Sequence, residues 1–192
     1  MNKNLLTLFK TEILDDKIIL NDEKEFNEKI EVLKKQKPRF RSNLSGFQSE
    51  DLNLSENIYF YLISQINILS NQLSSHYRFN RFLAVKNMWL NINKYKDSNA
   101  SHFHPDSIFS GVYYLNVPEN SGAIVFKNPT FSYMTLYWPD HIVDNFNSLN
   151  SSIWRINPYK NQILIFPSWL EHMVEPSLNL NEERITLSFN VR

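Results

Sequence analysis

The sequence predicts a mainly β protein, a β-sandwich or jelly roll that is preceded by helices. From about residue 81, short segments rich in strand-forming residues follow one another, and turn signals separate them. No helical segments alternate with them, so a parallel sheet built from strand–helix–strand units is not expected. Aromatic residues make up 14% of the 192-residue chain, and they suit a β-rich core or a lined pocket.

Two helices are expected in the first 80 residues. The first begins after Asn21–Lys24 and ends before Pro38, and the second runs from about Ser55 to Ser74. The polar segment 42–49 between them reads as a loop. Apolar residues recur at helical spacing in both helices, at Phe26, Ile30 and Leu33 and at Ile58, Leu62, Ile66 and Leu69.

The strands expected after the helices are short, and turns such as Pro118–Gly122 and Asn157–Pro158 separate them. The length fits one domain over residues 1–192, with residues 1–80 mostly helical and residues 81–192 forming the jelly-roll core. The expected strands are Phe82–Ile92, Gly111–Val117, Ala123–Lys127, Ser132–Tyr137, Ile153–Ile156, Gln162–Phe166 and Ile185–Val191.

The composition excludes several classes of function. Lys and Arg number 20, as do Asp and Glu, so the net charge is zero and no nucleic-acid or anionic-membrane footprint is expected. The absence of Cys excludes disulfides, thiolate zinc sites and a Cys nucleophile, so any metal must be bound by His, Asp or Glu. With only 3 Gly, the chain has no glycine-rich phosphate-binding loop.

The sequence also predicts where the protein acts. It has no apolar run of about 18 residues, as a transmembrane helix would need. The N-terminal residues Met1–Leu6 lack the long apolar core of a signal peptide. We therefore expect a soluble cytoplasmic domain.

Five histidines are present, and three of them could bind a metal. His102 and His104 are two residues apart, so they lie on one face of an extended segment. Asp106 could join them, although Pro105 favours a turn there. His172 follows an expected strand about 70 residues further along. Two imidazoles with a carboxylate or a third nitrogen would occupy one face of an octahedral Fe(II), as non-haem oxygenases require.

The alternative is that the two neighbouring histidines are a chance pair on the surface. The remaining histidines, His76 and His141, are expected in surface or loop positions, and His141 could lie near the substrate mouth.

Several motifs together resemble a known family, the 2-oxoglutarate/Fe(II)-dependent oxygenases of bacteria and phages. This family is a branch of the jelly-roll dioxygenase superfamily, and the resemblance covers most of the chain. It implies a double-stranded β-helix buttressed by the N-terminal helices. The motifs are Ser42-Asn43 with Gly46-Phe47-Gln48-Ser49, His102-Phe103-His104-Pro105, Ser110-Gly111-Val112-Tyr113-Tyr114-Leu115, Phe126-Lys127-Asn128-Pro129, Phe166–Pro176 and Glu183–Asn190.

The resemblance assigns roles to single residues. His172 corresponds to the distal iron ligand. Arg184, twelve residues on, corresponds to the basic residue that binds the C5 carboxylate of 2-oxoglutarate, and a guanidinium binds a carboxylate strongly through two hydrogen bonds. Thr186 occupies the position of a hydroxyl residue near the same carboxylate. Tyr114 and Tyr95 resemble tyrosines that line the co-substrate pocket.

Each of these roles has a structural alternative. The two tyrosines could simply pack in the core. Arg184 could form a surface ion pair with Glu182 or Glu183, although the apolar strand around it favours an inward position.

The proximal iron ligands depart from the superfamily pattern of His-x-Asp. His102 is the favoured first ligand, with His104 as third ligand or as a close neighbour of the iron. The segment His104-Pro105-Asp106 also reads as His-x-Asp, displaced by two residues. Asp106 therefore remains an alternative candidate for the carboxylate ligand of the iron.

The resemblance implies an enzyme that uses Fe(II), 2-oxoglutarate and O2 to hydroxylate a C–H bond, with release of succinate and CO2. The alternative is a cupin-like metal-binding protein, or a three-histidine dioxygenase, that does not use 2-oxoglutarate. Expected partners are a small-molecule or peptide substrate, with no nucleic acid and no membrane, and a homodimer is left open.

Overall fold

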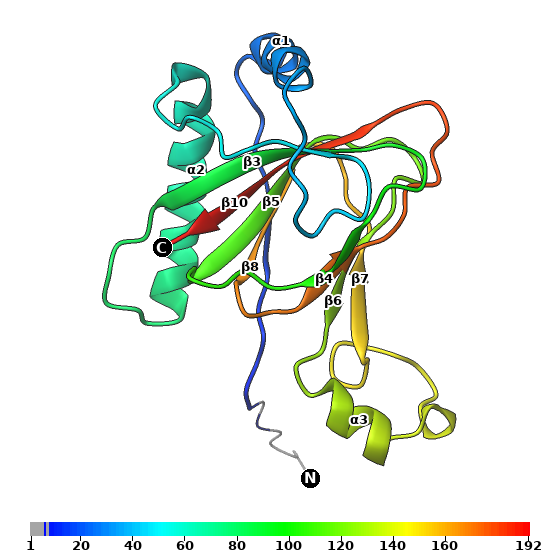
Figure 1. The fold of residues 1–192 in the computed structure, drawn as a ribbon. Helices are drawn as coiled ribbons and strands as arrows, with labels where there is room; N and C mark the ends of the chain where they lie inside the picture. The colour runs from blue at the N-terminus through cyan, green and yellow to red at the C-terminus, as the bar shows by residue number, and fades with distance from the viewer. Residues whose placement is uncertain (1–5, 7) are drawn as a thin grey trace.

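Two antiparallel sheets pack face to face, and helices cover the outer face of the larger sheet (Figure 1). This computed structural model describes residue 6 and residues 8–192. The larger sheet has the order β1-β8-β5-β10-β3-β2 and the smaller one β4-β9-β6-β7. The strands are β1 Leu14–Lys17, β2 Phe47–Gln48, β3 Val85–Asn93, β4 Asn99–His102, β5 Phe109–Asn116, β6 Ile124–Lys127, β7 Ile153–Ile156, β8 Gln162–Pro167, β9 His172–Val174 and β10 Arg184–Val191.

Helices α1 (Glu23–Leu33) and α2 (Asn57–His76) bury their apolar stripes in the outer core, against the larger sheet. The Asp22 carboxylate caps α1 by accepting the Glu25 amide at 2.9 Å. On α2, Leu62 and Ile66 have no exposed surface. The outer core therefore holds the two helices against the face of the larger sheet that points away from the smaller sheet. Both helices expected from the sequence are present.

A second, smaller core fills the space between the two sheets. Val112 and Phe166 of the larger sheet pack there with Ile124 and Phe126 of the smaller sheet. The space between the sheets is only partly filled by these side chains, since polar residues of β3, β4 and β10 also line it. This arrangement leaves room for a site between the sheets.

The predicted fold class is confirmed: the protein is mainly β with antiparallel sheets. Six of the seven expected strands are present within a few residues of their predicted bounds. The N-terminal part also contributes β1 and β2 to the larger sheet, which the sequence did not indicate. The short strands β4 and β9 were expected only as an extended segment and as a loop after β8.

The predicted strand Ser132–Tyr137 is wrong, because this segment forms helix α3, Phe131–Tyr137. Its aromatic residues and Thr135 favour strands, but in the described part of the chain this segment belongs to neither sheet. Immediately before the helix, the side-chain oxygen of Asn128 accepts the Thr130 amide at 2.9 Å and forms a turn that leads into it. A short 3-10 helix, Asp140–Ile142, follows α3.

Among the described residues, no helix combines the length and the apolar character that crossing a bilayer requires. The segment on which the absence of a signal peptide was judged, Met1–Leu6, lies mostly outside the described residues.

Candidate functional site

Three histidines meet between the sheets. His102 ends β4 and His172 begins β9, and the two are direct cross-strand partners. His104 follows two residues later, where its backbone amide donates to the Ser168 carbonyl at 2.9 Å. One ring nitrogen of each histidine lies within 4.8 Å of the corresponding nitrogens of the other two. The fold thus brings together residues that are about 70 positions apart in the chain.

Backbone carbonyls set the tautomers of two of these histidines. Nδ1 of His102 lies 2.7 Å from the Ala100 carbonyl, and Nδ1 of His172 lies 2.8 Å from the Leu170 carbonyl. A carbonyl oxygen can only accept, so both Nδ1 atoms carry the proton. The Nε2 atoms therefore keep their lone pairs, and Nε2 of His172 lies 3.3 Å from Nε2 of His104.

The environment keeps all three rings neutral. Burial, joined by the nearby His102, lowers the pKa of His104 to about 4 and that of His172 to about 3. Burial also lowers the pKa of His102. Neutral imidazoles are the form that binds metal ions.

This donor set fits an iron ion. Lone pairs of neutral imidazoles that converge without a protein donor between them repel one another, and a cation removes this repulsion. Imidazole nitrogen is a suitable ligand for iron. Within the described part of the chain, the group holds three histidines and no carboxylate.

The structure does not bring Asp106 to the histidines. Asp106 is exposed in a turn, with a φ of 61°, and its backbone carbonyl accepts from Lys86 Nζ at 3.3 Å. Pro105 ends the extended segment, so the alternation that aligns His102 with His104 does not continue to Asp106. The other two histidines, His76 and His141, are exposed, as expected.

The three histidines line a cleft of about 530 Å³ between the sheets, including the part open to solvent. Arg184, Thr186 and Tyr114 line the same cleft. The structure therefore brings together six of the eight residues predicted for the site. Asp106 and Tyr95 are the exceptions.

Arg184 is a buried cation with only 2% of its surface exposed. Its Nη1 atom donates to the carbonyls of Ser121 at 2.7 Å and of Gly122 at 3.1 Å. Gly122 has a φ of 84°, and a Cβ there would lie 2.3 Å from the Glu175 carbonyl oxygen, so the turn that presents these carbonyls requires glycine.

In the described part of the chain, no carboxylate forms an ion pair with Arg184. The neighbouring Glu183 binds Lys34 at 2.7 Å and Lys94 at 3.4 Å instead. The alternative of a surface ion pair between Arg184 and Glu183 therefore does not hold. Burial lowers the pKa of Arg184, and the charge of the more distant Asp97 offsets this only in part; the guanidinium nevertheless remains charged.

Tyr114 and Thr186 flank Arg184 on the inner face of the larger sheet. They are cross-strand partners between β5 and β10, and both are buried. Burial raises the pKa of Tyr114, so its hydroxyl stays protonated. Tyr95 lies beyond the end of β3, is 44% exposed and has Lys96 Nζ 5.2 Å from its ring centroid. The alternation of β3 no longer applies at Tyr95, which explains why it does not reach the cleft.

Several polar residues of the cleft were missed from the sequence. Asn91 and Asn93 of β3 and Ser188 of β10 line it, and Asn91 Nδ2 donates to Ser188 Oγ at 2.9 Å. The signal was present in β10, where polar and apolar residues alternate from Arg184 to Asn190. This period of two places every polar residue of the strand on the face of Arg184.

Solved structures with similar folds include a hydroxylase and an α-ketoglutarate-dependent epimerase. A prolyl-4-hydroxylase from Pseudomonas putida aligns with a TM-score of 0.64 and 12% identity, over 95% of this chain and 92% of that one. The α-ketoglutarate-dependent epimerase SnoN from nogalamycin biosynthesis gives a TM-score of 0.68 and 11% identity, over 94% and 76%. HygX from Streptomyces hygroscopicus, solved with nickel and 2-oxoglutarate, gives 0.60 and 12%, over 94% and 82%. At these identities the likeness shows the fold alone.

Sequence comparison identifies the family. No curated protein matches the chain. The family model described as "Putative 2OG-Fe(II) oxygenase", where 2OG is 2-oxoglutarate, matches residues 87–190, more than half of the chain. The match includes the three histidines, Tyr114, Arg184 and Thr186. The protein therefore belongs to the 2OG-Fe(II) oxygenase family, as the sequence motifs indicated, and is a 2-oxoglutarate-dependent dioxygenase with Fe(II), 2-oxoglutarate and O2 as its cofactors.

Proposed function

We propose that the protein hydroxylates a C–H bond of a small molecule or a peptide. The reaction consumes one 2-oxoglutarate and one O2, inserts one oxygen atom of O2 into the C–H bond, and releases CO2 from the C1 carboxylate of 2-oxoglutarate together with succinate, whose new carboxylate contains the other oxygen atom. His102, His104 and His172 hold Fe(II), and Arg184 binds the C5 carboxylate of 2-oxoglutarate.

One observation carries this proposal: an unpaired, buried guanidinium lines the same cleft as three converging imidazoles. A buried charge without a partner is costly, and an anionic ligand that completes it recovers that cost. Nη1 is held by the two carbonyls of Ser121 and Gly122. The remaining N–H groups of Arg184 can then bind a carboxylate in the geometry that a planar guanidinium favours.

Thr186 and Tyr114 complete the carboxylate site. The Thr186 hydroxyl stands two residues from Arg184 on the same strand face, and the protonated Tyr114 hydroxyl lies on the adjacent strand. Both can donate to a carboxylate beside the guanidinium. Val112, Ile124 and Phe166 line the apolar part of the cleft and exclude water from it.

The bound iron supplies redox chemistry with O2 that no side chain can supply. The histidines contribute by staying neutral, and His102 and His172 do so by presenting Nε2 in fixed tautomers. The protein therefore orients the two substrates and shields the reaction from solvent.

A second candidate is a three-histidine dioxygenase that does not use 2-oxoglutarate. The absence of a carboxylate from the described histidine group favours it. Arg184 argues against it, because an enzyme without a dicarboxylate co-substrate has no use for an unpaired buried cation behind the metal.

The test is succinate formation from 2-oxoglutarate by the Fe(II) protein with ascorbate, first alone and then with peptides and small molecules. The control for iron is His172→Ala, and the matched control is His141→Ala, which alters an exposed histidine. We expect succinate from the wild type and from His141→Ala at equal rates. Succinate at the His172→Ala level in the iron-loaded wild type under all conditions would overturn the proposal.

A further inference from the structure

Asn93 lies directly beside Arg184 on the inner face of the larger sheet. The two residues are cross-strand partners between β3 and β10, so their Cβ atoms are about 4.5–5.5 Å apart and their side chains leave the sheet on the same face. Both line the cleft, and Asn93 has only 4% of its surface exposed. The amide of Asn93 is therefore close to any group that the guanidinium binds.

The fold does not use this amide. In the described part of the chain, the Asn93 side chain forms no hydrogen bond, although the side chains of Asn91 beside it and Arg184 opposite it both do. Buried polar side chains are nearly always hydrogen-bonded, and each exception calls for an explanation. Two N–H donors and an amide oxygen thus remain free at the wall of the cleft.

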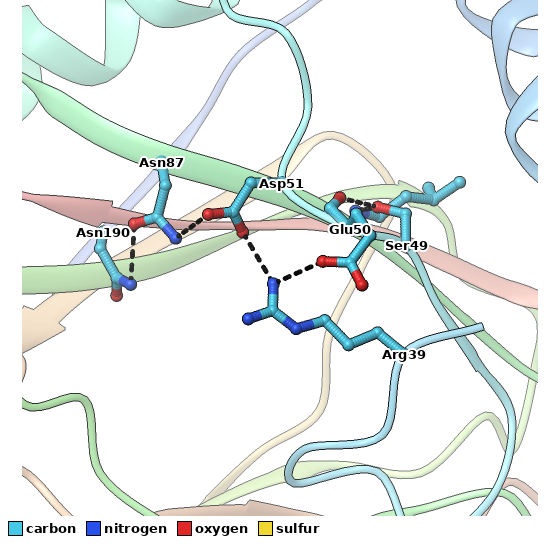
Figure 2. A network of polar contacts seen from close by, with 7 residues as sticks. Arg39, Ser49, Glu50, Asp51, Asn87 and Asn190 are labelled. Atoms are coloured by element: carbon cyan, nitrogen blue, oxygen red, sulfur yellow. Dashed lines mark hydrogen bonds and ion pairs between the residues drawn. The ribbon is translucent and has the colours of Figure 1, made fainter. Parts of the chain in front are cut away.

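Asn87 shows the opposite case on the same strand and the same face (Figure 2). Its Oδ1 accepts from Asn190 Nδ2 at 3.1 Å, and its Nδ2 donates to Asp51 Oδ2 at 3.2 Å. Arg39 binds Asp51 in turn, with Nη1 3.4 Å from Oδ1. The amide of Asn87 therefore serves the fold at both of its ends, and the amide beside Arg184 does not.

The charge at position 93 also fits a ligand better than a structural pair. An acidic side chain there would form a cross-strand ion pair with Arg184 and cancel its charge. The neutral amide leaves that charge available and adds N–H donors next to it. Because an ionised carboxylate can only accept, a carboxylate ligand bound to Arg184 requires donors of this kind.

We propose that Asn93 is a second binding residue for the C5 carboxylate of 2-oxoglutarate, and that it contributes to the preference for a dicarboxylate co-substrate. Asn93 Nδ2 donates to the carboxylate from β3, while Arg184 binds it from β10 and Tyr114 from β5. These three strands are neighbours in the larger sheet, with β10 in the middle. The inference rests on the proposed function, because it takes Arg184 as the partner of the C5 carboxylate.

The first test compares two co-substrates in the anaerobic Fe(II) protein. 2-Oxopentanoate keeps the 2-oxo acid end of 2-oxoglutarate and has a methyl group in place of the C5 carboxylate. The metal-to-ligand charge-transfer absorption gives the dissociation constant of each. Asn93→Leu keeps the size of the side chain and removes its donors. It should weaken binding of 2-oxoglutarate by about 10–100-fold, as expected for a hydrogen bond to a charged group, and leave binding of 2-oxopentanoate unchanged.

The matched control is Asn87→Leu, which makes the same change on the same face of β3. It should leave both dissociation constants unchanged in the folded protein. Equal losses for the two co-substrates in Asn93→Leu, or no loss for either, would overturn the proposal. So would a selective loss in Asn87→Leu as large as that in Asn93→Leu.

Asn93→Asp tests the sign of the contact. The aspartate carboxylate has nearly the shape of the amide, but it supplies a counter-ion to Arg184 and repels the C5 carboxylate. We expect weaker binding of 2-oxoglutarate than in Asn93→Leu. Wild-type affinity in Asn93→Asp would contradict a donor role for Asn93.

Denaturant melts of the metal-free protein give a readout that depends on neither iron nor activity. Asn93 has no side-chain partner to lose, so Asn93→Leu should not lower the unfolding midpoint. Asn87→Leu should lower it, because Asp51 and Asn190 each lose a partner. A fall in Asn93→Leu as large as that in Asn87→Leu would show that Asn93 serves the fold and would overturn the proposal.

These outcomes separate the inference from the proposed function. No charge-transfer band with 2-oxoglutarate in the iron-loaded wild type would overturn both. A band in the wild type that weakens in Arg184→Ala, together with unchanged affinity in Asn93→Leu, would overturn the role of Asn93 alone.

Discussion

The two faces of the larger sheet show how one strand can serve two purposes. On its outer face, β10 places Leu187, Phe189 and Val191 in the core beneath the helices, each with at most 2% of its surface exposed. On its inner face it places Arg184, Thr186, Ser188 and Asn190 toward the smaller sheet. The period of two of a strand thus separates the side chains that stabilise the fold from those that form the site.

The difference lies in what each face needs from its surroundings. The apolar side chains need only close packing, which many side chains can supply. Each polar side chain needs a particular partner, as Arg184 has in two carbonyls and Asn190 in Asn87 and Ser110. Changes on the outer face should therefore alter stability, and changes on the inner face should alter binding.

The largest expected effect is at the histidines. His172→Ala and His102→Ala should each abolish iron binding, because two remaining ligands hold Fe(II) poorly. Equilibrium dialysis with Fe(II) under anaerobic conditions measures this. Retention of iron by folded His172→Ala would exclude His172 as a ligand.

On the outer face, Phe189→Ala should lower the free energy of unfolding by about 3–5 kcal/mol, as expected for truncation of a fully buried Phe. The Phe189 ring fills the space next to Gly111. Because glycine has no side chain, position 111 cannot fill the cavity that Phe189→Ala would leave. Denaturant melts measure the change. Iron binding by the folded fraction should be retained, and loss of it would show that the two faces are coupled.

The pH dependence of stability should reflect the buried imidazoles. The pKa values of about 4 for His104 and about 3 for His172 lie below the value of 6.5 for an unperturbed histidine. Between these values the unfolded chain binds protons that the folded chain does not, so stability falls as the pH falls from 6.5 toward 4.

Denaturant melts of the metal-free protein between pH 7 and pH 4 test this dependence. The double variant His104→Gln, His172→Gln should show a shallower fall in stability than the wild type. Equal slopes in the two proteins would mean that the imidazoles are not buried as neutral groups.

The smallest effect is expected at Asp106. Asp106→Asn removes the carboxylate and tolerates the positive φ of the turn. Because Asp106 is exposed and outside the histidine group, iron affinity should stay unchanged and stability should change by at most about 0.5 kcal/mol. Loss of iron would instead support the displaced His-x-Asp pattern.

Much of the architecture could be predicted because it depends on local periodicity. The stripe of α2 and the alternation of β10 are visible in the sequence, and both elements are present. Helix α3 was mistaken for a strand because its aromatic residues favour strands, whereas the Asn128 turn and the absence of a pairing partner decide its form. Pairing partners are a property of the fold, not of the segment.

The site was predictable to a similar degree. The spacing of His102 and His104 predicted a shared face, and the structure brings both to His172. The contact of Asn190 with Asn87 could not be foreseen, because it joins β10 to a strand that is 103 residues earlier in the chain. The strand register that aligns Asn190 with Asn87 fixes this contact, and the register becomes known only with the fold.

The most direct measurement of the central claim is a titration of 2-oxoglutarate into the anaerobic Fe(II) protein, followed by the metal-to-ligand charge-transfer absorption. We expect a saturable band in the wild type and none in His172→Ala. In Arg184→Ala the affinity should fall by about two to three powers of ten, because loss of one partner of a buried charged pair costs about 2–5 kcal/mol. Arg184→Lys should recover only part of it. Unchanged affinity in Arg184→Ala, or no band in the iron-loaded wild type, would contradict a site in which three histidines and Arg184 bind iron and 2-oxoglutarate together.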